Sequence, residues 1–262
     1  MENEVKTRPQ FYPLEDLSHP NYQKAKELSP AQQEGKFCVV VTAQETNLNE
    51  GSRGSEKPTA PIPSPSTLAG ALAGVWWHPG VRFSILEYIV MREIKSHSQT
   101  KNEIETAPTI GFVDRLRKKE GEGEAQDFSF KADVPRQQRS TGYLRGVKYI
   151  VVVQMVPHTE YTERFRPEKS FPQFKRHLVN GARFSPYLGP RECLADIRLC
   201  TLEDLMEASP YDGMCIDFGR RPFQCDFRGE EKVWYQYHPI MIDGHIAVPS
   251  EKEVMGDAAY TA

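Results

Sequence analysis

The order of strand-like and helix-like segments constrains the fold of this chain more than any other feature of its sequence. Segments rich in β-branched and apolar residues predict four main strands, over residues 36–42, 81–94, 143–156 and 193–200. Apolar residues at helical spacing predict two helices, over residues 65–77 and 169–180. The chain order is therefore strand, helix, strand, strand, helix, strand.

This order is the ferredoxin-like arrangement, which also underlies RNA-recognition modules, so we predict an α+β, ferredoxin-like domain over residues 36–200. We predict a partly disordered extension over residues 1–35, where prolines are scattered among polar residues. We expect a β-rich C-terminal extension over residues 201–262, with short strands at 214–218, 233–237 and 245–248 and a turn at Asp243 and Gly244. Three segments lack a regular pattern and are predicted loops: residues 47–65, residues 97–109 and a charged, mobile insertion near 115–135.

Each predicted helix has one apolar face. In the first helix this face is formed by Leu68, Leu72, Val75 and Trp76, and Pro79 and Gly80 end the segment. In the second helix the apolar face is formed by Phe171, Phe174 and Leu178, opposite Lys175 and Arg176.

Positive charge is concentrated in one part of an acidic chain. Residues 136–198 contain 12 Lys and Arg against 5 Asp and Glu, whereas the whole chain has a net charge of −3. The aromatic residues interleaved with these charges are Tyr143, Tyr149, Tyr161, Phe165, Phe171, Phe174, Phe184 and Tyr187. Because arginine and lysine attract phosphates and aromatic rings stack on bases, single-stranded RNA is the first partner to test. The alternative is a solvated charged face above an aromatic core.

Composition excludes several other classes of protein. The most apolar run, residues 149–153, is far shorter than the ~20 residues that cross a bilayer, and the acidic N-terminus predicts no signal peptide. Five scattered cysteines without a C-x-x-C pair argue against a disulfide framework or a structural metal, so we expect a cytoplasmic protein without a cofactor. Phosphate-binding and dinucleotide-binding glycine motifs are also absent from the sequence.

Three stretches stand out as motifs: residues 63–70 (PSPSTLAG) running into 75–79 (VWWHP), residues 136–139 (RQQR) leading into 144–149 (LRGVKY), and residues 187–193 (YLGPREC). Together they resemble one family, the Cas-five proteins of CRISPR systems, especially the type I-C members that process precursor CRISPR RNA. Residues 101–103 and 241–244 resemble weaker family stretches, so the likeness spans roughly residues 60–250.

The resemblance implies an RNA-binding subunit that grips the 5′ handle of a CRISPR RNA, together with other subunits of a surveillance complex that meets target DNA. The residues that would bind RNA are Trp76, Lys101, Arg136, Arg139, Arg145, Lys175, Arg176, Arg183, Tyr187 and Arg191. For Arg145 and Arg191 the alternative is an internal pair with a carboxylate such as Glu192.

A second hypothesis is an endoribonuclease. The resemblance implies metal-independent cleavage, in which a ribose 2′-hydroxyl attacks the adjacent phosphate with the help of a base, an acid and a cation. Nuclease members carry a tyrosine at the position of Trp76 and a lysine-histidine pair at Lys169 and Ser170, so only the lysine is retained. The candidate catalytic residues are then Lys169 as the cation and His78 or His177 as a substitute for the missing histidine. A third hypothesis is a protein-interaction scaffold whose basic face docks on an acidic partner.

Overall fold

Strands dominate this mixed α/β protein. The computed structural model describes residues 36–49, 56–104, 111, 114, 136–226 and 232–256, so the predictions for the N-terminal extension and the charged insertion lie outside the described residues. Within the described residues, nine strands form one sheet with the order β6-β1-β5-β3-β11-β10-β7, and β2 and β4 also pair with β5. These strands are β1 (Lys36–Thr46), β2 (Glu56–Lys57), β3 (Val81–Val90), β4 (Ser96–Ile104), β5 (Arg136–Pro157), β6 (Ala195–Leu199), β7 (Cys215–Asp217), β10 (Ile240–Ile242) and β11 (His245–Ala247).

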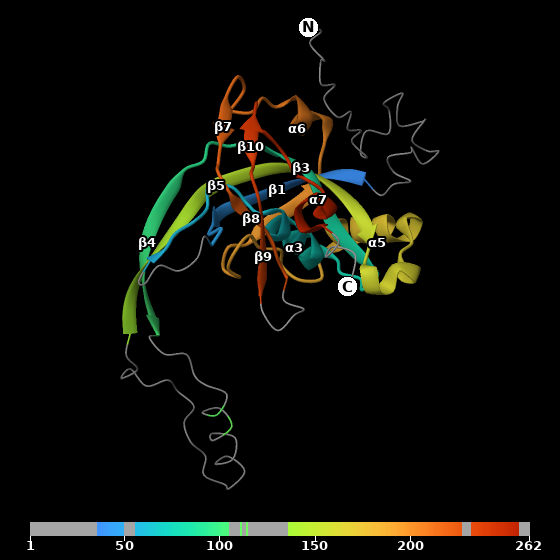
Figure 1. Ribbon diagram of the computed structural model, residues 1–262, viewed down its shortest axis with the longest axis horizontal. Helices are drawn as coiled ribbons and strands as arrows, with labels where there is room; N and C mark the ends of the chain where they lie inside the picture. The colour runs from blue at the N-terminus through green and yellow to red at the C-terminus, as the bar shows by residue number, and fades with distance from the viewer. Residues whose placement is uncertain are drawn as a thin grey trace.

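The long strand β5 organises the sheet. Its second half lies between β1 and β3, with Val151 opposite Val39 on one side and Tyr88 on the other. Its first half pairs with β4 and extends away from the rest of the molecule as an arm (Figure 1). One strand therefore belongs both to the core and to an exposed surface.

Helices α3 (Pro65–Val75) and α5 (Pro167–Asn180) connect β1 to β3 and β5 to β6, and both pack on the same face of the sheet (Figure 1). Leu68 and Leu72 of α3 are fully buried there. Phe174 of α5 is also fully buried, and its ring lies 5.2 Å from that of Phe37 and 5.3 Å from that of Phe83, measured between centroids. The four predicted main strands and both predicted helices are thus confirmed.

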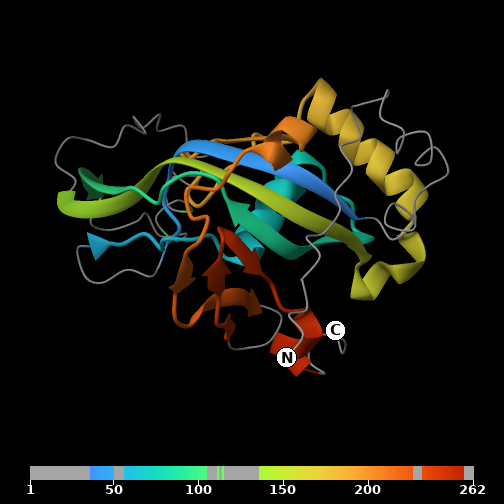
Figure 2. The same ribbon diagram turned by 90° about the horizontal axis from the view of Figure 1, so that it is seen from above.

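Residues 201–256 add further strands at the β3 edge of the sheet, as the view from above also shows (Figure 2). β11 pairs with β3, and the turn between β10 and β11 is the predicted one, with Asp243 at φ 53° and Gly244 at φ 81°. β8 (Arg221–Asp226) and β9 (Val233–Tyr237) form a separate two-stranded sheet. Two short helices, α6 (Leu202–Met206) and α7 (Glu251–Met255), each begin with a capping box. None of the described helices combines the length and the apolar composition that a membrane span needs.

The prediction of a loop over residues 97–109 is wrong for the part that the structure describes. Residues 96–104 form β4, which pairs in continuous register with β5, from Ser96 opposite Leu144 to Ile104 opposite Arg136. Residues 96–103 of β4 are polar, as the arm stands away from the core, so no apolar alternation marks β4 as a strand. Two other predictions need smaller corrections: the strand predicted to reach residue 94 ends at Val90, and residues 56–57 of a predicted loop form β2.

Candidate nucleic-acid interface

Three segments that are distant in sequence meet at the C-terminal end of α3. The backbone N–H of Arg183 donates to the carbonyl of Val75 at 2.8 Å, and the N–H of Phe184 donates to Gly74 at 3.0 Å. The N–H of His158 donates to the carbonyl of Gly80 at 3.1 Å. The end of the helix is therefore bordered by residues 158–164 on one side and by residues 183–184 on another.

Exposed aromatic rings and arginines gather at this junction. The guanidinium carbon of Arg183 lies 6.0 Å from the ring centroid of Trp77 and 5.5 Å from that of Phe184. The Trp77 and Phe184 side chains are 53% and 55% exposed, so both rings are open to a ligand. Arg164 lies over the ring of Tyr161, with its guanidinium carbon 4.9 Å from the centroid. We call the set Trp77, His78, Tyr161, Arg164, Arg183 and Phe184 the α3 C-terminal surface.

Such a surface suits single-stranded nucleic acid. Aromatic faces stack on bases without regard to sequence, and arginine both stacks and contacts phosphates. The negative end of the α3 dipole at this point also favours the cations gathered around it.

Trp76, which we predicted to stack on bases, does not provide the exposed ring. It is only 6% exposed, and its ring packs in near-parallel orientation on His78, at 5.8 Å between centroids and an angle of 16°. Trp76 is the C-cap residue of α3, with an extended backbone (φ −152°, ψ 126°), and its side chain is buried, whereas the next residue, Trp77, faces solvent. The sequence placed Trp76 among the apolar residues of the helix face, which already favoured its burial.

The three candidate catalytic residues lie on different parts of this region. Lys169 is exposed in the first turn of α5, and the adjacent Ser170 is 6% exposed. His177 follows Lys169 by eight residues, which is about 12 Å along the helix axis. Its side chain lines a separate hollow of about 400 Å³ together with Asp196. The Nδ1 atom of His78 accepts a hydrogen bond from the backbone N–H of Gly80 at 3.1 Å, which leaves Nε2 to carry the proton.

The predicted apolar face of α5 is confirmed, but of the two basic residues predicted opposite it only Arg176 is fully exposed. Phe174 is buried, and Phe171 and Leu178 pack against the core. Arg176 is exposed and Lys175 is half-buried on the helix. The outer face of α5 is thus basic, with Lys169 and Arg176 seven residues apart and therefore on the same side.

The other predicted RNA-binding residues lie on the arm and on the loop formed by residues 187–193. Lys101 of β4 connects the two, because its Nζ atom is 3.4 Å from a carboxylate oxygen of Glu192 and 4.9 Å from the ring centroid of Tyr143. A hydrogen bond with Tyr143 and the charge of Glu192 raise the pKa of Lys101. Arg139 Nε lies 3.7 Å from the carboxylate of Glu103.

Four of the predicted RNA-binding residues on the arm and the loop are exposed: Arg136, Arg145, Tyr187 and Arg191. An internal pair with a carboxylate such as Glu192 was the alternative for Arg145 and Arg191. In the structure Glu192 pairs with Lys101 instead.

Comparison with known proteins identifies the family. The sequence model described as "CRISPR-associated protein (Cas_Cas5)" matches residues 49–249, which is most of the chain. The chain belongs to this Cas5 family. All three stretches that carry the resemblance lie within the matched range, as do the α3 C-terminal surface and the loop at residues 187–193.

Two relatives of this Cas5 chain carry the name "CRISPR pre-crRNA endoribonuclease Cas5d". The relative from Thermus thermophilus is 29% identical over 216 residues, which cover 75% of this chain and 84% of the relative. The relative from Mannheimia succiniciproducens is 24% identical over 155 residues, which cover 59% of this chain and 68% of the relative. A solved structure titled "Crystal Structure of CRISPR-associated Protein" shares the fold, with a TM-score of 0.59 and 20% identity over 84% of this chain and 94% of that one.

Proposed function

We propose that this Cas5-family chain is an RNA-binding subunit of a CRISPR surveillance complex and that it holds the 5′ handle of the guide RNA. Family membership supports the general role. The observation that carries the proposal is the exposed Arg183 near the exposed rings of Trp77 and Phe184, because arginine and open aromatic rings together bind both phosphates and unpaired bases. Other subunits, and target DNA through them, are the further partners that this role implies.

The fold proposed for this role is ferredoxin-like. The four strands β6, β1, β5 and β3 are neighbours in that order, each pair is antiparallel, and α3 and α5 make the two crossings on one face. This arrangement supports the β-α-β-β-α-β unit predicted from the sequence. We also propose a cytoplasmic location, since all five cysteines are free thiols, as expected in a reducing compartment.

RNA binding is tested by fluorescence anisotropy with the single-stranded repeat RNA of the same CRISPR array. We expect the double variant Trp77→Ala/Arg183→Ala to weaken binding roughly 10- to 100-fold, since stacking contributes about 1–3 kcal/mol per base. We expect the dependence of log K on log[salt] to become shallower by about 0.7, since one cation that contacts single-stranded RNA is lost.

Arg92→Ala is the matched control for a lost positive charge. The Arg92 side chain is 55% exposed and pairs with Glu207. It follows the end of β3, whereas His78 precedes the start of that strand, so the two lie about 30 Å apart at 3.3 Å per residue. Equal loss of affinity in Arg92→Ala and in the double variant would refute the assignment of the surface. If the wild-type chain binds no RNA, the proposed function is refuted and the hypothesis of a protein-interaction scaffold is favoured.

Cleavage of precursor RNA is the second candidate function. It is favoured by the names of the two relatives and by the exposed Lys169, and opposed by the burial of Trp76 and Ser170. The test is incubation of the purified chain with repeat RNA in EDTA. We expect intact RNA in a stable complex. Cleavage that survives EDTA, disappears in Lys169→Ala and persists in the control Lys95→Ala, an exposed lysine paired with Glu93, would instead establish the nuclease.

A further inference from the structure

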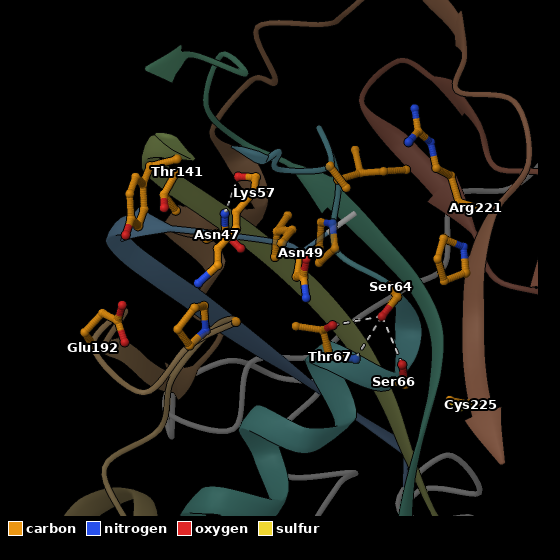
Figure 3. A pocket seen from close by; sticks show the side chains of 18 of the residues that line it. Asn47, Asn49, Lys57, Ser64, Ser66, Thr67, Thr141, Glu192, Arg221 and Cys225 are labelled. Atoms are coloured by element: carbon orange, nitrogen blue, oxygen red, sulfur yellow. Dashed lines mark hydrogen bonds between the residues drawn. The ribbon is translucent and has the colours of Figure 1, made fainter. Parts of the chain in front are cut away.

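A pocket of about 760 Å³ lies at the N-terminal end of α3, opposite the α3 C-terminal surface (Figure 3). The 11 residues of α3 place the two ends of the helix about 16 Å apart, so the pocket is a separate site. Two of the three stretches that carry the family resemblance contribute to its walls, through Ser64 and Gly189 among others, and Thr141 of β5 lies between the two parts of the third stretch. The hairpin of β8 and β9 closes one side with Arg221 and Trp234.

Three hydroxyl groups cluster where α3 begins. The Ser64 Oγ atom lies 2.9 Å from Ser66 Oγ and 2.8 Å from Thr67 Oγ1, and it accepts the backbone N–H of Thr67 at 3.2 Å (Figure 3). Two contacts among three hydroxyls use at most two of the three protons. At least one O–H is therefore left to donate to a ligand, at a helix end whose dipole favours an anion.

Thr141, on the opposite wall, provides a second and independent indication of a ligand. It is only 5% exposed, and its Oγ1 atom has no hydrogen-bond partner among the residues that the structure describes. Leaving a buried hydroxyl unpaired is unfavourable. The oxygen itself exposes almost no surface, so a ligand group in the pocket pairs with it when the Thr141 side chain turns toward the cavity. The neighbouring Asn47, by contrast, donates from Nδ2 to the carbonyl of Gly142 at 2.6 Å.

Charged groups of both signs stand beside Thr141. Lys57 is held by Glu103, with the Nζ atom 2.7 Å from each carboxylate oxygen, and Lys101 is held by Glu192. The lining thus offers ammonium donors and carboxylate acceptors at fixed positions. A nucleobase carries both acceptors and donors on its edges, and such a mixed set matches it better than it matches a simple anion.

The remaining walls are flat and apolar. They are formed by Leu48, Ala60, Ile62, Pro63, Pro190, Pro222 and Trp234. Trp234 is 61% exposed, so its ring is open to a base entering the pocket. The volume lies within the range of sites that bind small organic ligands.

We propose that this pocket binds one unstacked nucleotide of single-stranded RNA, with its phosphate at the hydroxyls of Ser66 and Thr67 and its base at Thr141 and Trp234. The inference rests on the proposed RNA-binding function and adds a second, enclosed subsite to the α3 C-terminal surface. The pocket holds a single base, whereas the α3 C-terminal surface is an open stacking platform.

The inference is tested by photocrosslinking with repeat RNAs that carry 4-thiouridine at one position at a time. We expect one position to crosslink to residues of the pocket, identified by mass spectrometry. We expect Trp234→Ala to abolish that crosslink and to weaken RNA binding roughly tenfold. Val233→Ala is the matched control, because the adjacent residue of β9 is also exposed and points to the other side of the strand.

Thr141→Val separates a binding role from a structural one. Valine keeps the shape of threonine and removes the unpaired hydroxyl, so we expect the melting temperature to stay the same or to rise while the crosslink weakens. A chain that retains RNA but crosslinks at no pocket residue, with Trp234→Ala and Thr141→Val both binding like wild type, would overturn this inference alone. A wild-type chain that retains no RNA would overturn the proposed function and this inference with it.

Discussion

Gly189 holds the loop at residues 187–193 against the end of β1, and replacing it with alanine is the sharpest test of how this loop is built. Its φ of +88° lies in the left-handed region, and a Cβ atom there would lie 1.8 Å from the backbone oxygen of Asn47. Both obstacles involve the backbone, so no side-chain rotation relieves them. Gly189→Ala must therefore move the loop off the strand.

The expected cost can be worked out from the contacts that this movement breaks. The left-handed backbone alone costs an alanine about 1–2 kcal/mol. The loop is also held by a hydrogen bond from Thr46 Oγ1 to the carbonyl of Leu188 at 2.6 Å and by one from the Leu188 N–H to Cys193 at 3.0 Å. Each contributes about 1 kcal/mol. With partial exposure of the fully buried Leu188, we expect a total of about 3–5 kcal/mol.

The assay is thermal denaturation beside a matched glycine. Gly219 also has a positive φ of +66°, but a Cβ there would meet nothing within 4 Å. At about 2–4 °C per kcal/mol for a chain of this size, Gly189→Ala should lower the melting temperature by about 6–20 °C and Gly219→Ala by about 2–8 °C. Equal shifts in the two variants would refute the reasoning, because the clash with Asn47 would then contribute nothing.

Three further predictions follow from single side chains. Trp76→Ala should lower the free energy of unfolding, measured by urea denaturation, by about 3–5 kcal/mol because the ring is buried. Trp77→Ala should change the free energy of unfolding by less than about 0.5 kcal/mol because the ring is exposed, and it should weaken RNA binding measured by anisotropy. The Arg198 guanidinium donates two hydrogen bonds of 2.6 Å to the Asp204 carboxylate and holds the pKa of Asp204 below its usual value. The contribution of this carboxylate to folding stability is therefore complete above the unfolded-state pKa of about 3.9 and is lost as the pH falls below that value. Urea unfolding between pH 3 and 7 should show a weaker loss in Asp204→Asn, and an unchanged loss would contradict this role. The Cys200 thiol and burial raise the pKa of Cys38, so iodoacetamide should modify the exposed Cys215 well before Cys38, and mass spectrometry would disprove this if Cys38 reacted first.

Segments with one buried face could be predicted from the sequence, because burial leaves a periodic pattern. α3 is an example, since its apolar residues recur at helical spacing. β1 was predicted from an unbroken run of apolar residues, which the structure buries on both faces of the strand. The arm could not be predicted in this way. β4 and the first residues of β5 are polar, and their strand conformation depends on pairing with each other across more than 30 intervening residues.

The pocket at the N-terminal end of α3 draws only in part on segments that the sequence singled out. Ser64 and Gly189 lie in motif stretches, whereas Thr141 and Tyr143 come from the part of β5 between the two halves of the third stretch. The unpaired Thr141 hydroxyl could not be found from the sequence, because its isolation results from the packing of β5 between β2 and β4. A hydroxyl without a partner is a property of the assembled fold.

Two pairs of adjacent residues show how motif and periodicity together select the side chains that face RNA. At the end of α3, the C-cap residue Trp76 is buried, while Trp77, the next residue, faces solvent. On α5, Ser170 lies four residues before the buried Phe174 and is itself buried, while Lys169 is exposed. The family resemblance points to both members of each pair, and the apolar stripe decides between them. The RNA contacts expected here therefore come from Trp77 and Lys169, whereas Trp76 and Ser170, where the family resemblance implies catalytic side chains in nuclease members, are buried.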